Sequence, residues 1–254
     1  MNAIVQDTKA TASPKRRARI AGVLYLIVAV FAAFSYNYAT GTTYIPGDAA
    51  ATAQAVLANA GLVRTGVVAD LIQATAWIFV AMALYLLLRH VNENRARAMV
   101  ILVAVGATIV CVKQVFPVAA LLVATELPYV TAFGAAGSNA LALLLLDMHH
   151  YGSLIAQIFM GLWLVPLGYL AYASGLFPRA LGVALVAGGG GWIAGSLAGL
   201  LDPASGEAFN RSAMLLPTIA EVWLLGYLLV KGVRSPGAFD RRPVAVRGPV
   251  AVTR

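Results

Sequence analysis

The ionisable side chains that could do chemistry in this chain are few, and several interrupt long apolar runs. The runs contain four charged side chains and three amides: Arg64, Asp70, Lys113, Glu221, Gln73, Gln114 and Gln157. Two adjacent histidines, His149 and His150, stand at the start of another run. A charge placed in hydrocarbon costs about 3 kcal/mol, so it needs a partner, a water-filled cavity or a functional role. Carboxylates and histidines in such places can exchange protons, bind a solute or hold a metal.

Helical spacing sorts these groups into stripes. Asp70, Gln73 and Trp77 recur at i, i+3 and i+7, so they share one face of a helix. His150 and Gln157 share one face of a second helix for the same reason. If both faces point inward, they form a polar chamber open to the outside, with tryptophans and a glycine-rich helix as its floor.

The elements that must position these groups are six apolar runs. The chain has 254 residues, of which 61% are hydrophobic and 11% charged, a composition that excludes a soluble globular protein. Runs of about 20 apolar residues cross the bilayer as helices, because backbone polar groups must be satisfied inside lipid. We therefore predict an all-α, six-helix membrane bundle with spans at about 20–38, 62–88, 98–123, 151–172, 180–201 and 212–230.

Positive charge sits almost entirely on one side of these spans. With the N-terminus inside, fifteen of the 18 Lys and Arg residues fall in inner segments, and only Arg211 falls in an outer loop. Arg64 and Lys113 lie within spans. This bias predicts that both termini are cytoplasmic, in the cytoplasmic (inner) membrane. It also favours lipid headgroups over nucleic acid as the partner of the basic tails.

The remaining segments are read from their composition. Residues 1–19 and 233–254 are predicted to be disordered basic tails that flank one transmembrane domain at 20–232. Asp48 precedes an alanine-rich stretch and predicts a short surface helix. Residues 139–150 form either an interfacial or re-entrant helix, or an outward extension of the fourth span.

The ionisable groups are predicted to lie at similar depths, in the outer half of the membrane. With a rise of about 1.5 Å per residue, Asp70 and Glu221 lie roughly 10–14 Å below the outer surface. Lys113 lies nearer the outer than the inner face, and His149 stands at the outer mouth of the fourth span. We expect Asp70, Lys113, His149 and Glu221 to converge on one wetted hollow beneath the outer surface.

Glycines at four-residue intervals line one face of the fifth span. Gly191, Gly195 and Gly199 form a small-residue stripe of the kind that lets helices approach closely in lipid. The stripe indicates helix packing, either within the chain or in contact with a partner subunit or a second copy.

Several short motifs resemble one family of membrane proteins. They are Arg19-Ile-Ala-Gly-Val-Leu-Tyr-Leu26, Arg64-Thr-Gly66, Asp70-Leu71, Ala83-Leu-Tyr85, Val91-Asn92, His149-His-Tyr-Gly152, Phe159-Met-Gly-Leu162, Gly168-Tyr-Leu170 and Phe177-Pro-Arg-Ala-Leu-Gly-Val183. The chain resembles, over about 16–232, the bacterial domain-of-unknown-function family 4386. The resemblance implies a bacterial protein with six spans, and Asp70 and His149 match recurrent acidic and histidine positions of the family. Trp163 stands where relatives often have a histidine.

Three functions fit these residues. The first is binding or transport of a small solute or ion, without a cofactor or a catalytic residue. Its binding residues would be Asp70, Gln73, Lys113, Gln114, His149, Gln157 and Glu221. The second is an intramembrane hydrolase or lipid-modifying enzyme, in which His149, His150, Asp70 and Glu221 hold a divalent metal and its water. The third is a non-catalytic membrane subunit or sensor.

Overall fold

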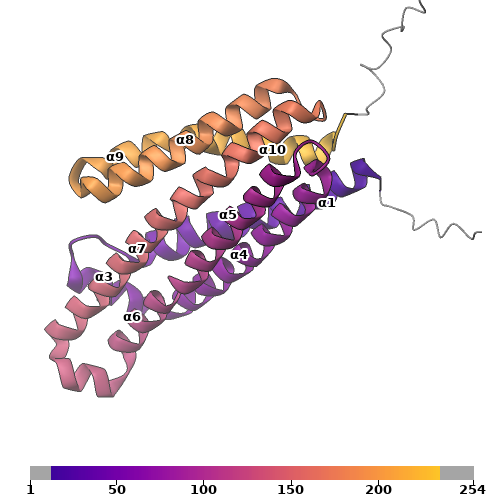
Figure 1. Cartoon of the computed structure of the whole chain (residues 1–254). Helices are drawn as coiled ribbons and strands as arrows, with labels where there is room; N and C mark the ends of the chain where they lie inside the picture. The colour runs from indigo at the N-terminus through magenta and orange to yellow at the C-terminus, as the bar shows by residue number, and fades with distance from the viewer. Residues whose placement is uncertain (1–12, 235–254) are drawn as a thin grey trace, which may run out of the picture.

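The computed structural model describes residues 13–234, and these fold almost entirely into helices, without a strand (Figure 1). Six of the helical segments in this range are long and apolar enough to cross a membrane. The predicted all-α membrane bundle of six long helices is therefore confirmed. The outer parts of both predicted tails, 1–12 and 235–254, lie outside the described residues.

The bundle begins with two long spans and a short helix between them. The first span joins α1 (Pro14–Ala33), a π-helix η1 (Phe34–Thr40) and one turn, α2 (Gly41–Thr43). The short helix α3 (Ala49–Ala58) begins as predicted, because the Asp48 carboxylate accepts a hydrogen bond from the Ala51 N–H at 2.9 Å. The second span is α4 (Ala60–Leu88).

The other four spans follow along the chain. Their helices are α5 (Glu93–Val112), α6 (Val115–Thr125), α7 (Leu127–Ser174), α8 (Arg179–Leu201), α9 (Pro203–Ala213) and α10 (Leu215–Val230). α5 and α6 together make the third span, and the last turns of α9 join α10 in the sixth.

Three boundaries differ from the sequence expectations. α1 begins at Pro14, with Ser13 as its N-cap, so residues 14–19 are helical where a disordered tail is predicted. α7 runs helically from its break at Gly134 through Ser174, so 139–150 extends the fourth span and forms no separate re-entrant helix. The connection after α8 is helix α9, so Arg211, which is predicted in an outer loop, lies within a helix.

The long helix α7 is the centre of the bundle. It packs against α8 on one side and against α5, α6 and α3 on the other, whereas α10 packs on α8, α1 and α9 (Figure 1). Besides a smaller cluster that joins α3 and α6 to α4 and α7, the main core lies between α1, α4, α5, α7, α8 and α10. Within it, Trp163 makes edge-on contacts with Trp77 and Tyr25, at ring-centroid distances of 5.7 and 6.0 Å.

Glycines bring α7 and α8 into backbone contact. A methyl group built on Gly168 would stand 2.6 Å from the carbonyl oxygen of Gly182, and one on Gly161 would stand 2.6 Å from that of Gly189. Any side chain larger than hydrogen would therefore push the two helices apart. Such close approach is the usual route to tight helix association in lipid.

The predicted glycine stripe packs within the chain. Gly191 and Gly195 face α9, where methyl groups would stand 2.9 Å from the Ala213 carbonyl oxygen and 2.5 Å from Asn210 Oδ1. Gly199 faces Leu154 of α7. These glycines therefore contact the chain's own helices, and a partner subunit would have to use another face.

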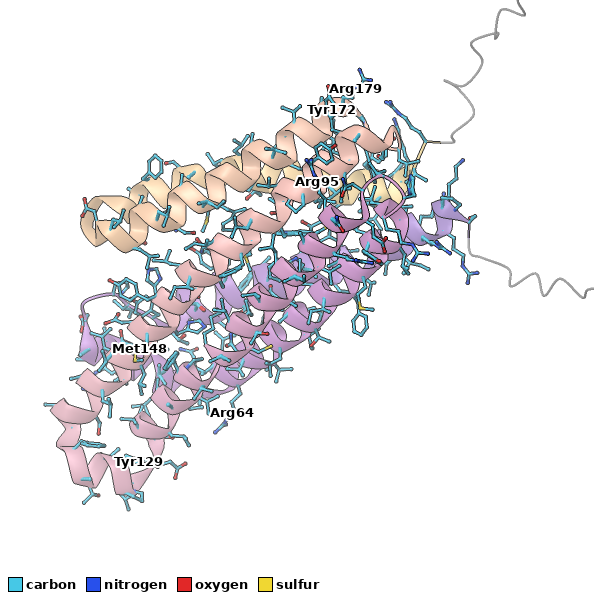
Figure 2. The ribbon with its side chains drawn as sticks, viewed as in Figure 1. Arg64, Arg95, Tyr129, Met148, Tyr172 and Arg179 are labelled. Carbon is cyan, nitrogen blue, oxygen red and sulfur yellow. The ribbon has the colours of Figure 1, made fainter. Side chains whose placement is uncertain are left out.

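The two ends of the bundle differ in charge. We call the end that carries Ser13, Arg234 and the turns 89–92 and 175–178 the basic end, and the opposite end the far end. Arg95 and Arg179 lie at the basic end, whereas Arg64 lies toward the far end (Figure 2). Arg95 stacks 3.4 Å over the ring of Tyr169, which holds this guanidinium against the bundle.

Candidate functional site

Three spans bring a lysine, an aspartate and a histidine together inside the bundle. Lys113 Nζ lies 3.2 Å from Asp70 Oδ2 of α4 and 3.0 Å from His149 Nε2 of α7. All three residues are buried, with exposed fractions of 5–8%. Three of the four groups expected to converge therefore do so. We call these three residues the ionic cluster.

A break in the third span positions Lys113. α5 ends at Val112 and α6 begins at Val115, so Lys113 and Gln114 form a tight turn between them. Pro117 accounts for the break, because it has no N–H and its ring would clash with the carbonyl of Lys113. That carbonyl instead accepts a hydrogen bond from the Phe116 N–H at 3.2 Å. Pro117 thus marks, in the sequence, the helix break that directs the charged side chain of Lys113 into the bundle.

A glycine on α7 makes room for the lysine. A methyl group built on Gly152 would stand 3.1 Å from the Lys113 Cβ. Gly152 therefore lets the broken span lie close to α7, within reach of His149 and Ser153.

The lysine ammonium is fully hydrogen-bonded. Its nitrogen has three acceptors: Asp70 Oδ2, His149 Nε2 and Ser153 Oγ, the last at 2.9 Å. An ammonium has three donors and no lone pair, so His149 must accept through Nε2 and carry its own proton on Nδ1. The Ser153 hydroxyl in turn donates to the His149 carbonyl oxygen at 2.9 Å. The arrangement orients a neutral imidazole against a cation.

Gln114 is a second hydrogen-bond donor to Asp70, beside Lys113. Its Nε2 donates to Asp70 Oδ2 at 2.6 Å and to the Val110 carbonyl oxygen at 3.0 Å. One carboxylate oxygen thus accepts from both the ammonium and the amide. Charge-assisted bonds of this kind are the strong ones, and they satisfy a carboxylate that would otherwise be costly to bury.

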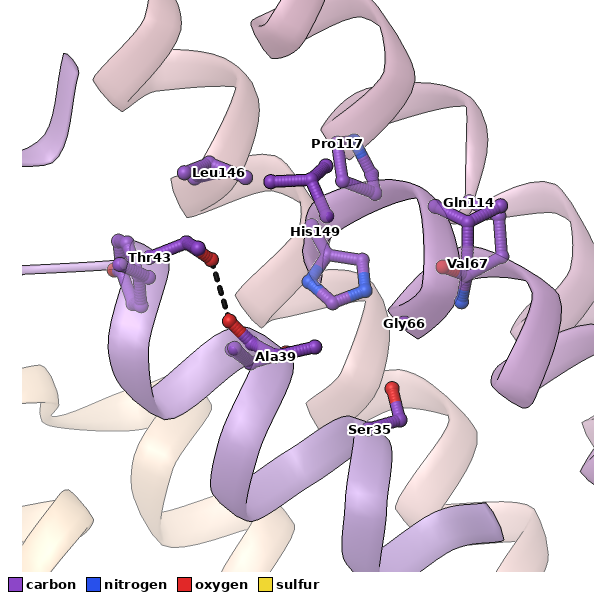
Figure 3. Close-up of a pocket in the computed structure, with 12 residues that line it drawn as sticks. Ser35, Ala39, Thr43, Gly66, Val67, Gln114, Pro117, Leu146 and His149 are labelled. Carbon is purple, nitrogen blue, oxygen red and sulfur yellow. Dashed lines mark hydrogen bonds between the residues drawn. The ribbon is translucent and has the colours of Figure 1, made fainter. Parts of the chain in front are cut away.

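A narrow cavity adjoins the ionic cluster and is shown in Figure 3. It has about 20 Å³ of free space, which is room for about one water molecule. His149 and Gln114 form one wall, and the π-helix η1 with α2 forms the opposite wall. Gly66 of α4 lets η1 approach, because a methyl group there would contact the Ala39 Cβ.

The cavity wall is partly polar. The hydroxyl-bearing residues that line it are Ser35, Thr40, Thr43 and Tyr44. Thr43 donates its hydroxyl proton to the Ala39 carbonyl oxygen at 2.6 Å, as the dashed line in Figure 3 indicates. A π-helical turn beside a polar cavity is a frequent feature of functional sites.

Tyr44 lines the cavity and contacts α7. Its hydroxyl donates to Asp147 Oδ1 at 2.7 Å, and its ring lies 5.8 Å from that of His150. Burial, followed by the hydrogen bond to Asp147, raises the pKa of Tyr44. The phenol therefore stays a donor at neutral pH. His150 turns toward Tyr44, whereas its neighbour His149 turns into the ionic cluster.

Two predicted site residues lie elsewhere. Gln157 Oε1 accepts from Ser196 Oγ at 3.2 Å and from Asn210 Nδ2 at 3.4 Å, between α7, α8 and α9. Glu221 accepts from Trp192 Nε1 at 3.0 Å, between α10 and α8.

The expected single chamber is therefore wrong, and helix geometry explains why. Gln157 follows His149 by eight positions, which turns it by about 80° around α7. Glu221 belongs to α10, which packs on α8, α1 and α9. Gln73, one turn from Asp70 on α4, is buried and its Oε1 has no hydrogen-bond partner among the described residues.

The alternative metal ligands are not gathered at one point. Within 13–234, no group of three or more His, Cys, Asp or Glu side chains is placed to hold a metal ion. Asp70 and His149 face the same cation, but that cation is the Lys113 ammonium. Glu221 instead contacts Trp192, and His150 contacts Tyr44.

The sequence analysis does not select three residues whose side chains contact the site, namely Ser153, Tyr44 and Asp147. Ser153 follows His149 by four positions, so a helical reading of α7 would have placed it on the same face. Tyr44 and Asp147 are 103 residues apart, and nothing local to either of them signals their hydrogen bond.

Comparison with known proteins gives one match. A model of the family described as Domain of unknown function (DUF4386) matches residues 20–232 of the chain. No curated protein and no solved structure matches it.

Proposed function

Since the chain belongs to the DUF4386 family, whose description assigns no activity, we propose its function from the geometry of its buried polar groups. We propose that it is a membrane protein that binds and transports a small solute or ion, with the proton as the ion that the ionic cluster handles. The observation that carries this proposal is the buried Asp70–Lys113–His149 contact across three spans, at a helix break and beside a cavity.

The chemistry of the three groups supports proton handling. The ammonium of Lys113 can pass a proton to His149 Nε2, which leaves a neutral amine and an imidazolium. Asp70 stabilises the positive charge wherever it resides on the two groups. Intramembrane ionisable residues arranged in this way are typical of proton relays in transporters.

The cavity limits what can reach the cluster in this conformation. Space for about one water molecule suits a hydrated proton path and excludes a larger solute until the helices move. The broken third span and the π-helical turn of the first span both border this space. Discontinuous helices at a central site are a recurrent feature of secondary transporters.

We also propose the orientation and the location. Positive charge concentrated at the basic end favours a cytoplasmic position for that end in a bacterial inner membrane. The cavity and the ionic cluster then lie in the outer half of the bundle, accessible from the outer face.

Proton flux in vesicles tests the proposed function. Full-length protein is reconstituted with a pH-sensitive dye inside, and a potassium gradient with valinomycin drives protons inward. The rate is measured alone and with each member of a panel of small organic acids and amines. We expect at least one member to accelerate internal acidification, and Asp70→Asn to abolish the effect.

Arg64→Gln is the matched control. Arg64 lies on the same helix as Asp70 but is exposed and outside the ionic cluster, so this variant should retain the flux. If the unsubstituted protein gives no flux with any panel member, or if Asp70→Asn retains it, the proposal fails. Stoichiometric metal that is retained on purification and lost in His149→Ala would instead favour the metal-dependent enzyme.

A further inference from the structure

A second intramembrane carboxyl group lies apart from the ionic cluster. Glu221 sits in α10, nine residues before Val230, which places it about 14 Å from the basic end of that helix. Its Oε1 accepts a hydrogen bond from Trp192 Nε1 of α8 at 3.0 Å. This depth lies near the middle of a hydrocarbon layer about 30 Å thick.

No cation accompanies this carboxyl group. Arg97–Glu93, Lys113–Asp70 and Arg211–Glu207 are ion pairs of the described part of the chain, and Glu221 belongs to none of them. The groups that face it are the Trp192 indole from α8 and the Tyr25 hydroxyl from α1, and neither carries a charge. The charged residues of the neighbouring helix α9, Glu207 and Arg211, pair with each other.

Tyr25 leaves a polar atom unused beside Glu221. The Tyr25 side chain is only 4% exposed, and its hydroxyl has no hydrogen-bond partner among the described residues. Its ring is fixed by the edge-on contact with Trp163. A phenol hydroxyl can donate to a carboxylate or accept from a carboxylic acid, so this unpartnered hydroxyl can serve Glu221 in either protonation state.

We infer that Glu221 is a proton-binding site, separate from the ionic cluster and filled at neutral pH. A lone carboxylate in hydrocarbon is costly, and uptake of one proton on its free oxygen removes the charge without any other reactant. The resulting carboxylic acid keeps the bond from Trp192 and can donate its new O–H to the Tyr25 hydroxyl oxygen. Loss of the proton restores the carboxylate, so the step is reversible.

This inference goes beyond the proposed function, because it requires no solute and no transport. It concerns a different helix pair from the ionic cluster, so either idea can fail without the other. It also makes a contrast within one molecule: Asp70 is a buried, paired ion, whereas the half-buried Glu221 is a neutral acid.

Dicyclohexylcarbodiimide, an apolar reagent that modifies protonated carboxyl groups, tests the contrast. Full-length protein in vesicles of phosphatidylethanolamine and phosphatidylglycerol is treated at a series of pH values, and the modified residues are mapped by mass spectrometry. We expect Glu221 to be modified at about pH 6 and to lose about tenfold in rate for each unit of pH above its midpoint. Asp70 should stay unmodified, because Lys113 keeps it ionised.

Two variants sharpen the test. Glu221→Gln should lose the modification. Trp192→Phe removes the donor that stabilises the carboxylate, so the midpoint of modification should move to higher pH, a shift that a purely structural role would not produce.

Three results would overturn the inference. They are no modification of Glu221 at any pH, equal modification of Asp70, and protection of Glu221 by sodium ions at constant pH. Sodium protection would identify a cation site in place of a proton site. If Glu221→Gln does not fold, the pH profile of Glu221 in the unsubstituted protein still decides the question.

Discussion

Asp70 and Lys113 stabilise the bundle only as a pair. Each side chain is at most 10% exposed, so removing one partner leaves the other as an uncompensated charge away from water. Breaking a buried pair in this way costs about 3–5 kcal/mol, whereas replacing both partners by neutral groups is often close to neutral. The contribution of the pair to the free energy of unfolding can therefore be measured without a transport assay.

We predict that Lys113→Met lowers the free energy of unfolding by about 3–5 kcal/mol. The double variant Asp70→Asn with Lys113→Met should recover most of that loss, because no unpaired charge remains. Arg97→Met is the control, since the Arg97–Glu93 pair at 2.9 Å is exposed and screened by solvent, so its loss should have little effect on stability. Denaturation in detergent micelles measures all three. Equal losses in the single and double variants would contradict the prediction.

The residues of the ionic cluster could be selected from the sequence because charge is conspicuous in an apolar run. Asp70, Lys113 and His149 share a similar depth, and depth follows from counting residues along each helix. The direction in which each side chain points does not follow from counting, because packing sets the rotation and tilt of a helix. Glu221 has a suitable depth too, yet its carboxyl group faces Trp192.

At the scale of elements, the contact between α7 and α8 depends on four glycines. Gly168 and Gly182 are the pair nearest the basic end, and each would place a methyl group within 2.7 Å of the other's carbonyl oxygen. Both atoms belong to helix backbones, so neither can move alone. The two helices must separate or tilt to admit a side chain.

We predict that Gly168→Ala lowers the free energy of unfolding by about 1–3 kcal/mol through overpacking. Gly226→Ala is the matched control, because Gly226 also lies inside a helix but has no atom within 4 Å of the added methyl. That variant should be neutral or stabilising by about 1 kcal/mol, since alanine favours helix more than glycine does. The prediction fails if both variants behave alike.

Tyr44 connects the turn after α2 with α7 through its hydrogen bond to Asp147. Bonds to charged groups contribute about 1.5–3 kcal/mol. Burial and this bond raise the pKa of Tyr44. The contribution is therefore complete below the pKa of about 10 of an unfolded tyrosine, and it is lost as the pH rises through the higher value of the folded protein.

We predict that Tyr44→Phe destabilises the protein at neutral pH by about 1–2 kcal/mol, toward the lower end of that range because the bond is only partly buried. The difference between Tyr44→Phe and the unsubstituted protein should shrink as the pH rises well above about 10. Thermal unfolding in buffers across that range measures the difference. Tyr129→Phe, at an exposed position in the first turn of α7, is the control and should show no difference at any pH. A difference that stays constant with pH would contradict the role of the phenol proton.

Some elements could be predicted from composition and others could not. The six spans follow from apolar length, and the start of α3 follows from Asp48. Helix α9 had a signal as well, because Asp202 and Pro203 are common at the N-cap and first position of a helix. The π-helix η1 had none: its Ala39 lies against Gly66 of α4, and a contact between residues so far apart in sequence is not visible in composition.

At the scale of the whole molecule, both described ends of the chain lie at the basic end (Figure 1). An even number of crossings brings them there, and the turns 89–92 and 175–178 join them. Arg89, Arg95, Arg97 and Arg179 belong to these turns or to the helices that follow them. The ionic cluster lies toward the far end of α4, α5 and α7, so the orientation of the molecule decides from which side protons reach it.

We predict that the basic end faces the cytoplasm, because lysine and arginine are retained on that side during insertion. Single cysteines at Asn94 and Ala136, in a Cys111→Ala background, report the two ends, since both positions are exposed in the described structure. In intact cells, a membrane-impermeant maleimide should label Ala136→Cys, and it should label Asn94→Cys only after the membrane is opened. The reverse pattern would place the cavity and the ionic cluster toward the cytoplasm. Proton uptake through them would then begin inside the cell, and the direction of the proposed transport would be inverted.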